Sequence, residues 1–181
     1  MLLRVIFAIL ALLAAVPARA ETDWTYGDWT ATAPHHDSAE DDWLVCTART
    51  GGDGWPILTV IAFEGDVGPP AAYPDIQLHE YAPRHYPTAM QAGQTVRFAF
   101  DTGLVAQTLP AVEIDEDGIQ NAYAGAVSPA SLDWLRAMQA GSRLEVTTGG
   151  QPVTTVSLNG FTAAYLKMME LCGFDGTGVT K

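Results

Sequence analysis

Four histidines carry the side chains best suited to metal or proton chemistry, and they fall into two groups. In the first group, His35 and His36 are followed by Asp37 and by three acids at 40–42. Imidazole nitrogens and carboxylate oxygens are common zinc ligands. Adjacent histidines, however, lack the i, i+4 spacing that places two ligands on one face of a helix. The preferred interpretation of 34–42 is therefore an acidic surface loop, with His35 and His36 as secondary metal candidates.

In the second group, His79 and Glu80 are followed by His85. The segment approaches the His-Glu-x-x-His signature of zinc proteases, in which both histidines bind the metal. That signature needs a histidine at position 83, where this chain has Pro83, and proline also interrupts the required helix. No catalytic residue is therefore predicted. His79 and His85 remain candidates for a pair of metal ligands. On this pair we base the second alternative function, a metal-dependent hydrolase.

The other polar motifs predict no cofactor. Glu113, Asp115 and Asp117 resemble half of a calcium loop, but its closing position holds Ala124 instead of a bidentate glutamate. The segment is better explained as a hairpin turn of the Asp-Gly type ending at Gly118. The chain has no nucleophile elbow, phosphate-binding glycine loop or dinucleotide fingerprint.

Aromatic side chains offer a different chemistry, because their faces stack on the apolar faces of sugar rings. The chain has five tryptophans and six tyrosines, and Trp55, Tyr81, His85 and Tyr86 are the first candidates for a ligand-binding platform. The competing interpretation is that most aromatics fill the core. A small-ligand or glycan-binding module is therefore the first alternative function.

Only two cysteines occur, Cys46 and Cys172, about 126 residues apart. An even pair in an exported chain predicts a disulfide, whereas two buried free thiols are the alternative. A metal site built on these two alone is disfavoured, since zinc ligands are usually paired locally. The expected role of a Cys46–Cys172 bridge is structural.

The first twenty residues predict export. A basic head containing Arg4 precedes an apolar run over 5–16, and Ala18-Arg19-Ala20 is a small-x-small cleavage site. This is the layout of a signal peptide, and its apolar run is shorter than the roughly 20 residues of a membrane span. We therefore expect a bacterial periplasmic or secreted protein, cleaved near Ala20, with no membrane span in the mature chain.

The mature chain is strongly acidic and the size of one domain. Loss of Arg4 and Arg19 with the leader leaves 7 basic against 21 acidic residues, a formal charge of −14. Such a surface repels phosphate backbones and anionic lipids, so nucleic-acid binding is not expected. Residues 21–172 are predicted to form a single β-rich domain, with 173–181 as a flexible tail.

Short apolar runs separated by turn residues predict a mainly β fold. The sequence ILTVIAF at 57–63 is apolar and β-branched, which predicts a central strand buried on both faces. Residues 95–101 alternate, which places Val96, Phe98 and Phe100 on one face. Further strands are predicted at 43–47, 104–109, 112–115, 119–123, 144–147 and 153–158, with a second hairpin turn at Gly149-Gly150 and a surface loop over 65–74.

Two short helices are also predicted. Ser128 and Pro129 supply a capping hydroxyl and a proline for the first helical position, so that this helix runs to about Ala140. Its expected buried stripe is Leu132, Leu135 and the pair at 138–139. The second helix runs from about 161 to 171 and places one set of residues on a common face: Phe161, Ala164, Tyr165, Met168 and Cys172. The expected architecture is a single antiparallel β-sandwich or curled sheet with two short helices.

The two ends of the chain resemble the invasion-associated locus B (IalB-like) family of exported proteobacterial proteins. Tyr26-Gly27-Asp28-Trp29 followed by Trp43-Leu44-Val45-Cys46 is similar to the start of that family, where a "GDW" strand precedes a cysteine-bearing strand. The stretch 156–164 (VSLNGFTAA) is similar to its closing strand-to-helix turn. The resemblance covers about a quarter of the mature chain. It departs from the family at 30–33, where members often have a cysteine, so a different disulfide arrangement is an open alternative.

The resemblance implies a compact β-rich protein with no established catalytic site. From it we expect a non-enzymatic exported domain that acts through a surface contact with an unknown protein or other cell-envelope partner. A role in host invasion is not carried over.

Overall fold

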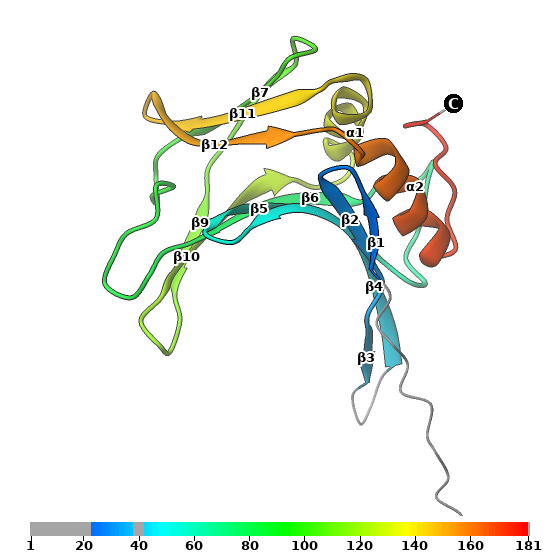
Figure 1. Ribbon diagram of the computed structural model, residues 1–181, viewed down its shortest axis with the longest axis horizontal. Coiled ribbons are helices and arrows are strands. Elements are labelled where there is room, and N and C mark those ends of the chain that lie inside the picture. Colours follow the sequence, from blue (N-terminus) through cyan, green and yellow to red (C-terminus); the bar gives the residue numbers. More distant parts are fainter. Residues whose placement is uncertain (1–22, 38–41, 181) are drawn as a thin grey trace, which may run out of the picture.

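The computed structural model describes residues 23–37 and 42–180, so the predicted signal peptide lies outside the described residues. The protein is mainly β, with two antiparallel sheets in a sandwich-like arrangement and two helices at one end (Figure 1). This agrees with the predicted fold class. No helix in the described part of the chain has the length and apolar character that a membrane span requires.

The larger sheet has the strand order β1-β2-β4-β5-β6-β10-β9, and β3 pairs additionally with β4. Its strands are β1 (Trp24–Tyr26), β2 (Trp29–Thr32), β3 (His35–Asp37), β4 (Asp42–Gly52), β5 (Trp55–Phe63), β6 (Asp75–Tyr81), β9 (Ala111–Ile114) and β10 (Gln120–Ala126). The β9–β10 hairpin turns at the predicted Asp-Gly site, where the Gly118 N–H donates to the Asp115 carbonyl over 2.9 Å. β5 is central, as predicted.

The smaller sheet has the order β12-β11-β7-β8 and faces one side of the larger sheet. Its strands are β7 (Val96–Phe100), β8 (Val105–Thr108), β11 (Arg143–Thr148) and β12 (Gln151–Ser157). Alternation in β7 buries Val96, Phe98 and Phe100, as predicted, because every second side chain points into the space between the sheets. The Gly149-Gly150 hairpin is also confirmed.

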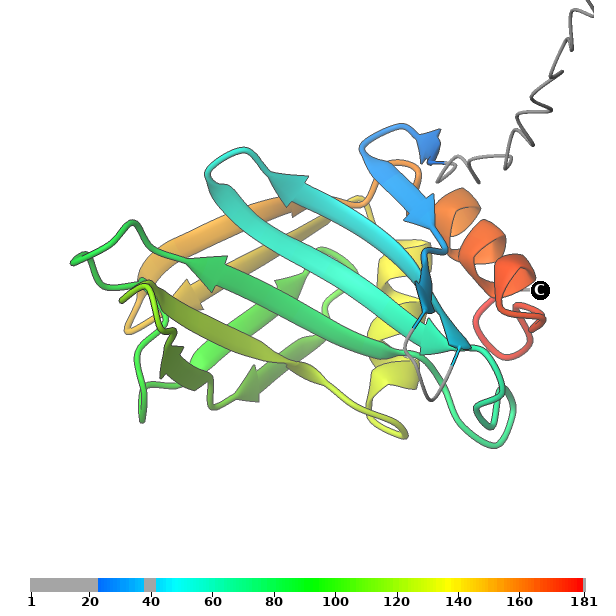
Figure 2. The ribbon, with the colours of Figure 1, turned by 90° about the horizontal axis from the view of Figure 1, so that it is seen from below.

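The helices α1 (Ser131–Ala140) and α2 (Phe161–Leu171) close one end of the sandwich, which we call the helix end (Figure 2). α2 buries the predicted face, and the disulfide Cys46–Cys172 joins its C-terminal end to β4, with a Cα–Cα distance of 5.9 Å. The prediction of this bridge is confirmed. A link across 126 residues of chain removes much of the entropy of the unfolded chain.

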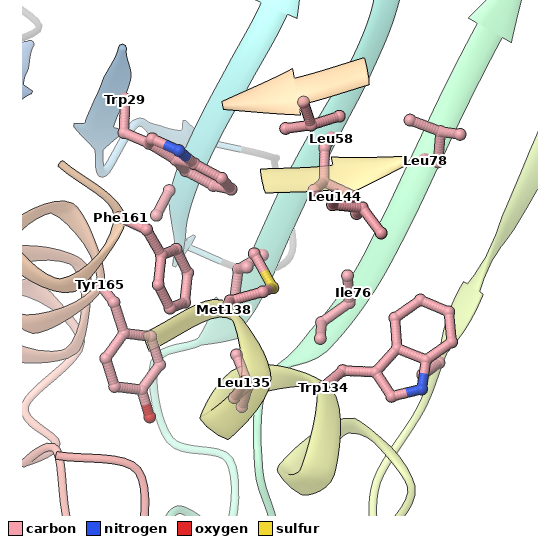
Figure 3. Close-up of a cluster of buried hydrophobic side chains, with 14 of the residues drawn as sticks. Trp29, Leu58, Ile76, Leu78, Trp134, Leu135, Met138, Leu144, Phe161 and Tyr165 are labelled. Carbon is pink, nitrogen blue, oxygen red and sulfur yellow. The ribbon is translucent and has the colours of Figure 1, made fainter. Parts of the chain in front are cut away.

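Aromatic side chains from β2, α1 and α2 lie among aliphatic ones in the core at the helix end (Figure 3). Trp29 packs edge-on against Phe161 at a centroid distance of 5.0 Å, and its indole N–H donates to the Ser157 carbonyl over 2.9 Å. Tyr165 lies beside Phe161 and is fully buried, and this burial raises its pKa, so the phenol stays neutral. Two segments distant in sequence, β2 and the β12–α2 stretch, therefore meet here through packed rings and one hydrogen bond.

Two strand and loop predictions need correction. The 57–63 strand is buried on one face only: Leu58 and Val60 are fully buried but Phe63 is 43% exposed, because no described layer covers the outer face of the larger sheet. The predicted loop over 34–42 contains strand β3, which pairs with the start of β4 and so finds backbone partners. Residues 38–41 lie outside the description.

The predicted start of the first helix is also wrong. α1 begins at Ser131, its N-cap residue Ala130 makes no side-chain cap, and the Ser128 hydroxyl instead accepts the Tyr73 N–H over 3.2 Å. Most of the predicted stripe is confirmed: Leu135 and Met138 are buried and Leu132 packs against the core, whereas Gln139 is exposed. Trp134, which was not predicted, is buried against Phe98 at a ring-centroid distance of 4.6 Å.

The segment after α2 lies against the domain. Val179 is buried, Phe174 packs against the core, and the Arg136 Nε–H donates to the Gly178 carbonyl over 2.8 Å. The expectation of a flexible tail therefore needs correction for residues 173–180. The glycine-rich composition of this segment favoured the prediction of a flexible tail, although it contains two apolar residues that pack against the domain, Phe174 and Val179.

Candidate functional site

The outer face of β5, β6 and β10, strands that lie side by side in Figure 2, carries two of the predicted site residues, His79 and Tyr81. Side chains alternate along each strand, so the residues that do not enter the core point outward. Ile57, His79 and Tyr123 pair across the three strands in one register row. His79, a metal candidate from the sequence, is thereby placed among aromatic and amide neighbours.

His79 is held between two partners from β10. Its ring stacks on Tyr123 with a centroid distance of 4.5 Å and an angle of 14° between the planes. Its Nε2–H donates to Asn121 Oδ1 over 2.9 Å. One ring nitrogen and one ring face are therefore already engaged within the sheet.

Tyr123 is a neutral hydrogen-bonding group in this row. Partial burial raises its pKa, and the negative charge and hydrogen bond of Glu113 raise it further. Glu113 lies on β9 directly opposite Asn121. Beside the row of Ile57, His79 and Tyr123, the cross-strand pair Asn121–Glu113 therefore adds an amide and a carboxylate, groups that hydrogen-bond polar ligands.

Tyr81 extends the cluster toward the end of β6. Its side chain is 46% exposed, and its ring lies 5.9 Å from His79 at an interplanar angle of 49°. β5 begins at Trp55 where β6 ends, since the two strands run antiparallel, so Trp55 lies at the same end of this strand pair. The Trp55 side chain lies outside the description.

The other two aromatic candidates, His85 and Tyr86, lie in the loop over 82–95 and are exposed. Glu80 fixes this loop, because its carboxylate accepts the backbone N–H groups of Ala89 and Met90 over 2.6 and 2.9 Å. Glu80, which stands at the general-base position of the protease-like motif in the sequence, therefore has a structural role. Backbone binding by a carboxylate explains its place at the strand end.

The metal candidates do not form a ligand set in the described part of the chain. No group of three or more His, Cys, Asp or Glu among these residues could hold a metal ion. His79 is engaged with Asn121 and Tyr123, and His85 sits in the loop. The side chains of His35 and His36 lie outside the description.

An apolar strip adjoins the His79 cluster on the same face. We define the outer-face strip by five apolar residues that share one hollow of about 380 Å³, namely Ile61, Phe63, Leu109, Ala111 and Val127. Leu109 and Val127 are 66% and 65% exposed. The polar residues Asp75 and Gln77 of β6 line the same hollow, between the apolar residues of β5 and those of β9 and β10. Large apolar residues exposed around a hollow and flanked by polar ones are typical of contact surfaces.

Sequence reasoning missed the outer-face strip. Leu109 ends the strand predicted over 104–109 and Val127 directly precedes Ser128-Pro129, positions that by themselves indicate no binding role. The available signal was a large apolar residue immediately before a proline-containing segment. Only the fold shows that these two positions lie beside the exposed end of β5.

No family model, curated protein or solved structure matches this chain.

Proposed function

We propose that the chain is an exported, non-enzymatic β-rich domain of the IalB-like type. Its role is to bind a protein partner of the bacterial cell envelope through the outer-face strip. The observation that carries the proposal is the exposure of Phe63, Leu109 and Val127 around one hollow on a sheet face that no described layer covers. Outward positions of a two-layer antiparallel sandwich are usually polar. The disulfide supports a location outside the reducing cytoplasm.

A photo-crosslinking side chain at position 127 tests the proposal in intact cells that make the full chain. We expect one discrete crosslinked species from position 127. The matched control is position 105, because Val105 is also an exposed strand-associated valine but lies in the smaller sheet. Equal crosslinking from both positions, or none from 127, contradicts the proposed surface.

Saccharide binding is the second candidate, and the His79 cluster specifically favours it. An exposed tyrosine, a stacked His–Tyr pair, an amide and a carboxylate lie together on a sheet face: Tyr81, His79, Tyr123, Asn121 and Glu113. A sugar ring can stack on Tyr81 while the amide and the carboxylate bind hydroxyl groups.

A panel of oligosaccharides in a thermal-shift screen tests this second function, because a ligand that binds only the folded state raises its Tm. We expect Tyr81→Ala to abolish the shift and Leu109→Ala, in the outer-face strip, to preserve it. A shift that survives Tyr81→Ala places the sugar elsewhere. Loss of crosslinking at position 127 upon Leu109→Ala, with no sugar response, favours the protein partner.

A further inference from the structure

The smaller sheet has an open edge at β12, to which no further strand of the described residues is paired. The Leu158 N–H donates to the Ser142 carbonyl over 2.9 Å, so residue 158 directs its backbone groups toward β11. The Ser157 carbonyl instead accepts the Trp29 indole N–H, on the opposite side of the strand. Backbone groups alternate along an antiparallel strand, so Thr155 also directs its N–H and carbonyl away from β11.

A hollow lies beside this edge. Its volume is about 600 Å³, and it is lined by 152–157 on one side and by Thr50, Gly51 and Pro56 of the β4–β5 hairpin on the other. Gly51 has φ +94°, and a Cβ there would lie 2.2 Å from the Pro56 carbonyl oxygen, so the wall keeps its shape only with glycine. Outward backbone groups of β12 therefore face a space large enough for another chain segment.

The usual protections of an edge strand are confined to the two ends of β12. Natural edges carry proline, charged side chains or bulges that prevent further pairing. Here Pro152 and a bulge with Val153 as its extra residue protect the end nearest the turn, and the Trp29 indole occupies the Ser157 carbonyl at the other end. Between them, from Thr154 to Ser157, the sequence TTVS contains neither proline nor charge. This stretch can therefore accept a strand.

The charges around the hollow indicate the kind of segment. It shares Thr50 and Gly51 with a polar hollow of about 300 Å³, whose lining includes Asp28, Asp53 and Arg49. The Ser157 hydroxyl donates to Asp28 Oδ2 over 2.6 Å, which places this carboxylate at the end of the β12 edge. The chain has a formal charge of −12, which opposes pairing with a second copy and favours a basic segment.

We propose that the β12 edge binds an extended, basic segment of a partner polypeptide as an added strand of the smaller sheet. The regular stretch 154–157 provides about 13 Å of edge, enough to pair with about four residues. Main-chain hydrogen bonds provide the affinity in this mode of recognition. A lysine or arginine of the segment lies beside Asp28 and Asp53. The site is separate from the outer-face strip and does not depend on it.

Selection of random linear peptides of about nine residues on the full mature chain tests the proposal, since the partner is unidentified. We expect enriched peptides to alternate β-branched residues and to carry at least one lysine or arginine. Thr155→Pro removes the outward N–H and should weaken a selected peptide by about tenfold or more. The matched control Thr155→Ala keeps that N–H and should bind as the parent does.

Amide hydrogen exchange on the parent protein keeps the test decisive if Thr155→Pro fails to fold. A selected peptide should protect the amide of Thr155 and leave those of β6 unchanged. A peptide whose basic residue is replaced by glutamate should bind at least about tenfold more weakly. The proposal is overturned if selection enriches no peptide, if Thr155→Pro binds as Thr155→Ala does, or if protection falls on β6 instead.

Discussion

The helix end of the sandwich and the outer face of β5, β6 and β10 contain similar aromatic and aliphatic residues in opposite surroundings. At the helix end Trp29, Phe161 and Tyr165 are completely buried and packed ring against ring. On the outer face Phe63 and Tyr81 each keep more than two fifths of their surface exposed. The two regions are joined through the sheet, since β4 carries the buried disulfide and pairs with β5.

The difference shows how stability and binding are divided in this molecule. The helix end gathers the long-range connections: the Cys46–Cys172 bridge, the Trp29–Ser157 hydrogen bond and the contact of Arg136 with the tail. The outer face has no comparable long-range covalent link among its described residues. Changes at the helix end should therefore reduce stability, whereas changes on the outer face should reduce binding and leave stability nearly unchanged.

The largest expected effect comes from the disulfide. Cys46→Ser removes a cross-link that closes 126 residues, which lowers the free energy of unfolding by about 5 kcal/mol in the chain-entropy model. The measurement is chemical denaturation under oxidising conditions. The double variant Cys46→Ser/Cys172→Ser is the control for a stray thiol, and the parent in reducing agent should approach it. An unchanged midpoint in all three would show that the bridge does not stabilise the fold.

The paired variants Trp29→Ala and Tyr81→Ala sharpen the comparison directly. Trp29→Ala leaves a cavity and an unpaired carbonyl at Ser157, and should lower the free energy of unfolding by about 3–5 kcal/mol. Tyr81→Ala alters an exposed side chain and should change it by less than about 0.5 kcal/mol. Thermal and denaturant unfolding of both variants provide the measurement. Similar losses would mean that the outer face is part of the structural core.

Much of the architecture was predictable because it rests on local patterns. The alternation of 95–101, the Asp-Gly and Gly-Gly turns, and the helical spacing of Phe161, Tyr165 and Met168 each specify an element without reference to the rest of the chain. The disulfide followed from the count of cysteines in an exported chain. None of these predictions required knowledge of how the strands and helices pack against one another.

The failed predictions depended on distant partners. β6 is absent from the predicted strands because His79 and Glu80 suggested a motif, although their neighbours on β5 and β10 make the segment a strand. The sequence predicted Ser128 as a helix cap, but its hydroxyl accepts a hydrogen bond from the backbone N–H of Tyr73, 55 residues earlier in the chain. Of the candidate site residues, His79 and Tyr81 share a face because they alternate along β6, whereas the sheet adds Tyr123 of β10. The outer-face strip joins residues of β5, β9 and the segments next to β8 and β10, whose proximity no local pattern encodes.

The smallest effect tests one further connection at the helix end, between β7 and the segment after α1. The carboxylate of Asp101 accepts the backbone N–H of Ser142 over 3.0 Å and its hydroxyl over 2.5 Å. The Ser142 hydroxyl, followed by backbone N–H groups, holds the pKa of Asp101 below its ordinary value. A carboxyl group with a lower pKa in the folded state stabilises the fold above its unfolded pKa, and this stabilisation disappears as the pH falls through the folded pKa.

Asp101→Asn should therefore be less stable than the parent at neutral pH, and the difference should shrink as the pH falls below about 4, the ordinary range of the unfolded pKa. Ser142→Ala removes the hydroxyl donor and should raise the Asp101 pKa, which carboxyl NMR titration measures directly. Because Asp101 lies at the surface, the change should be well below that of Trp29→Ala. A stability difference that persists unchanged at low pH would mean that the side-chain shape, rather than the carboxylate charge, matters at this junction. The helix end would then depend on packing, the disulfide and uncharged contacts such as the Trp29–Ser157 hydrogen bond, and its contrast with the outer face would be one of burial rather than of charge.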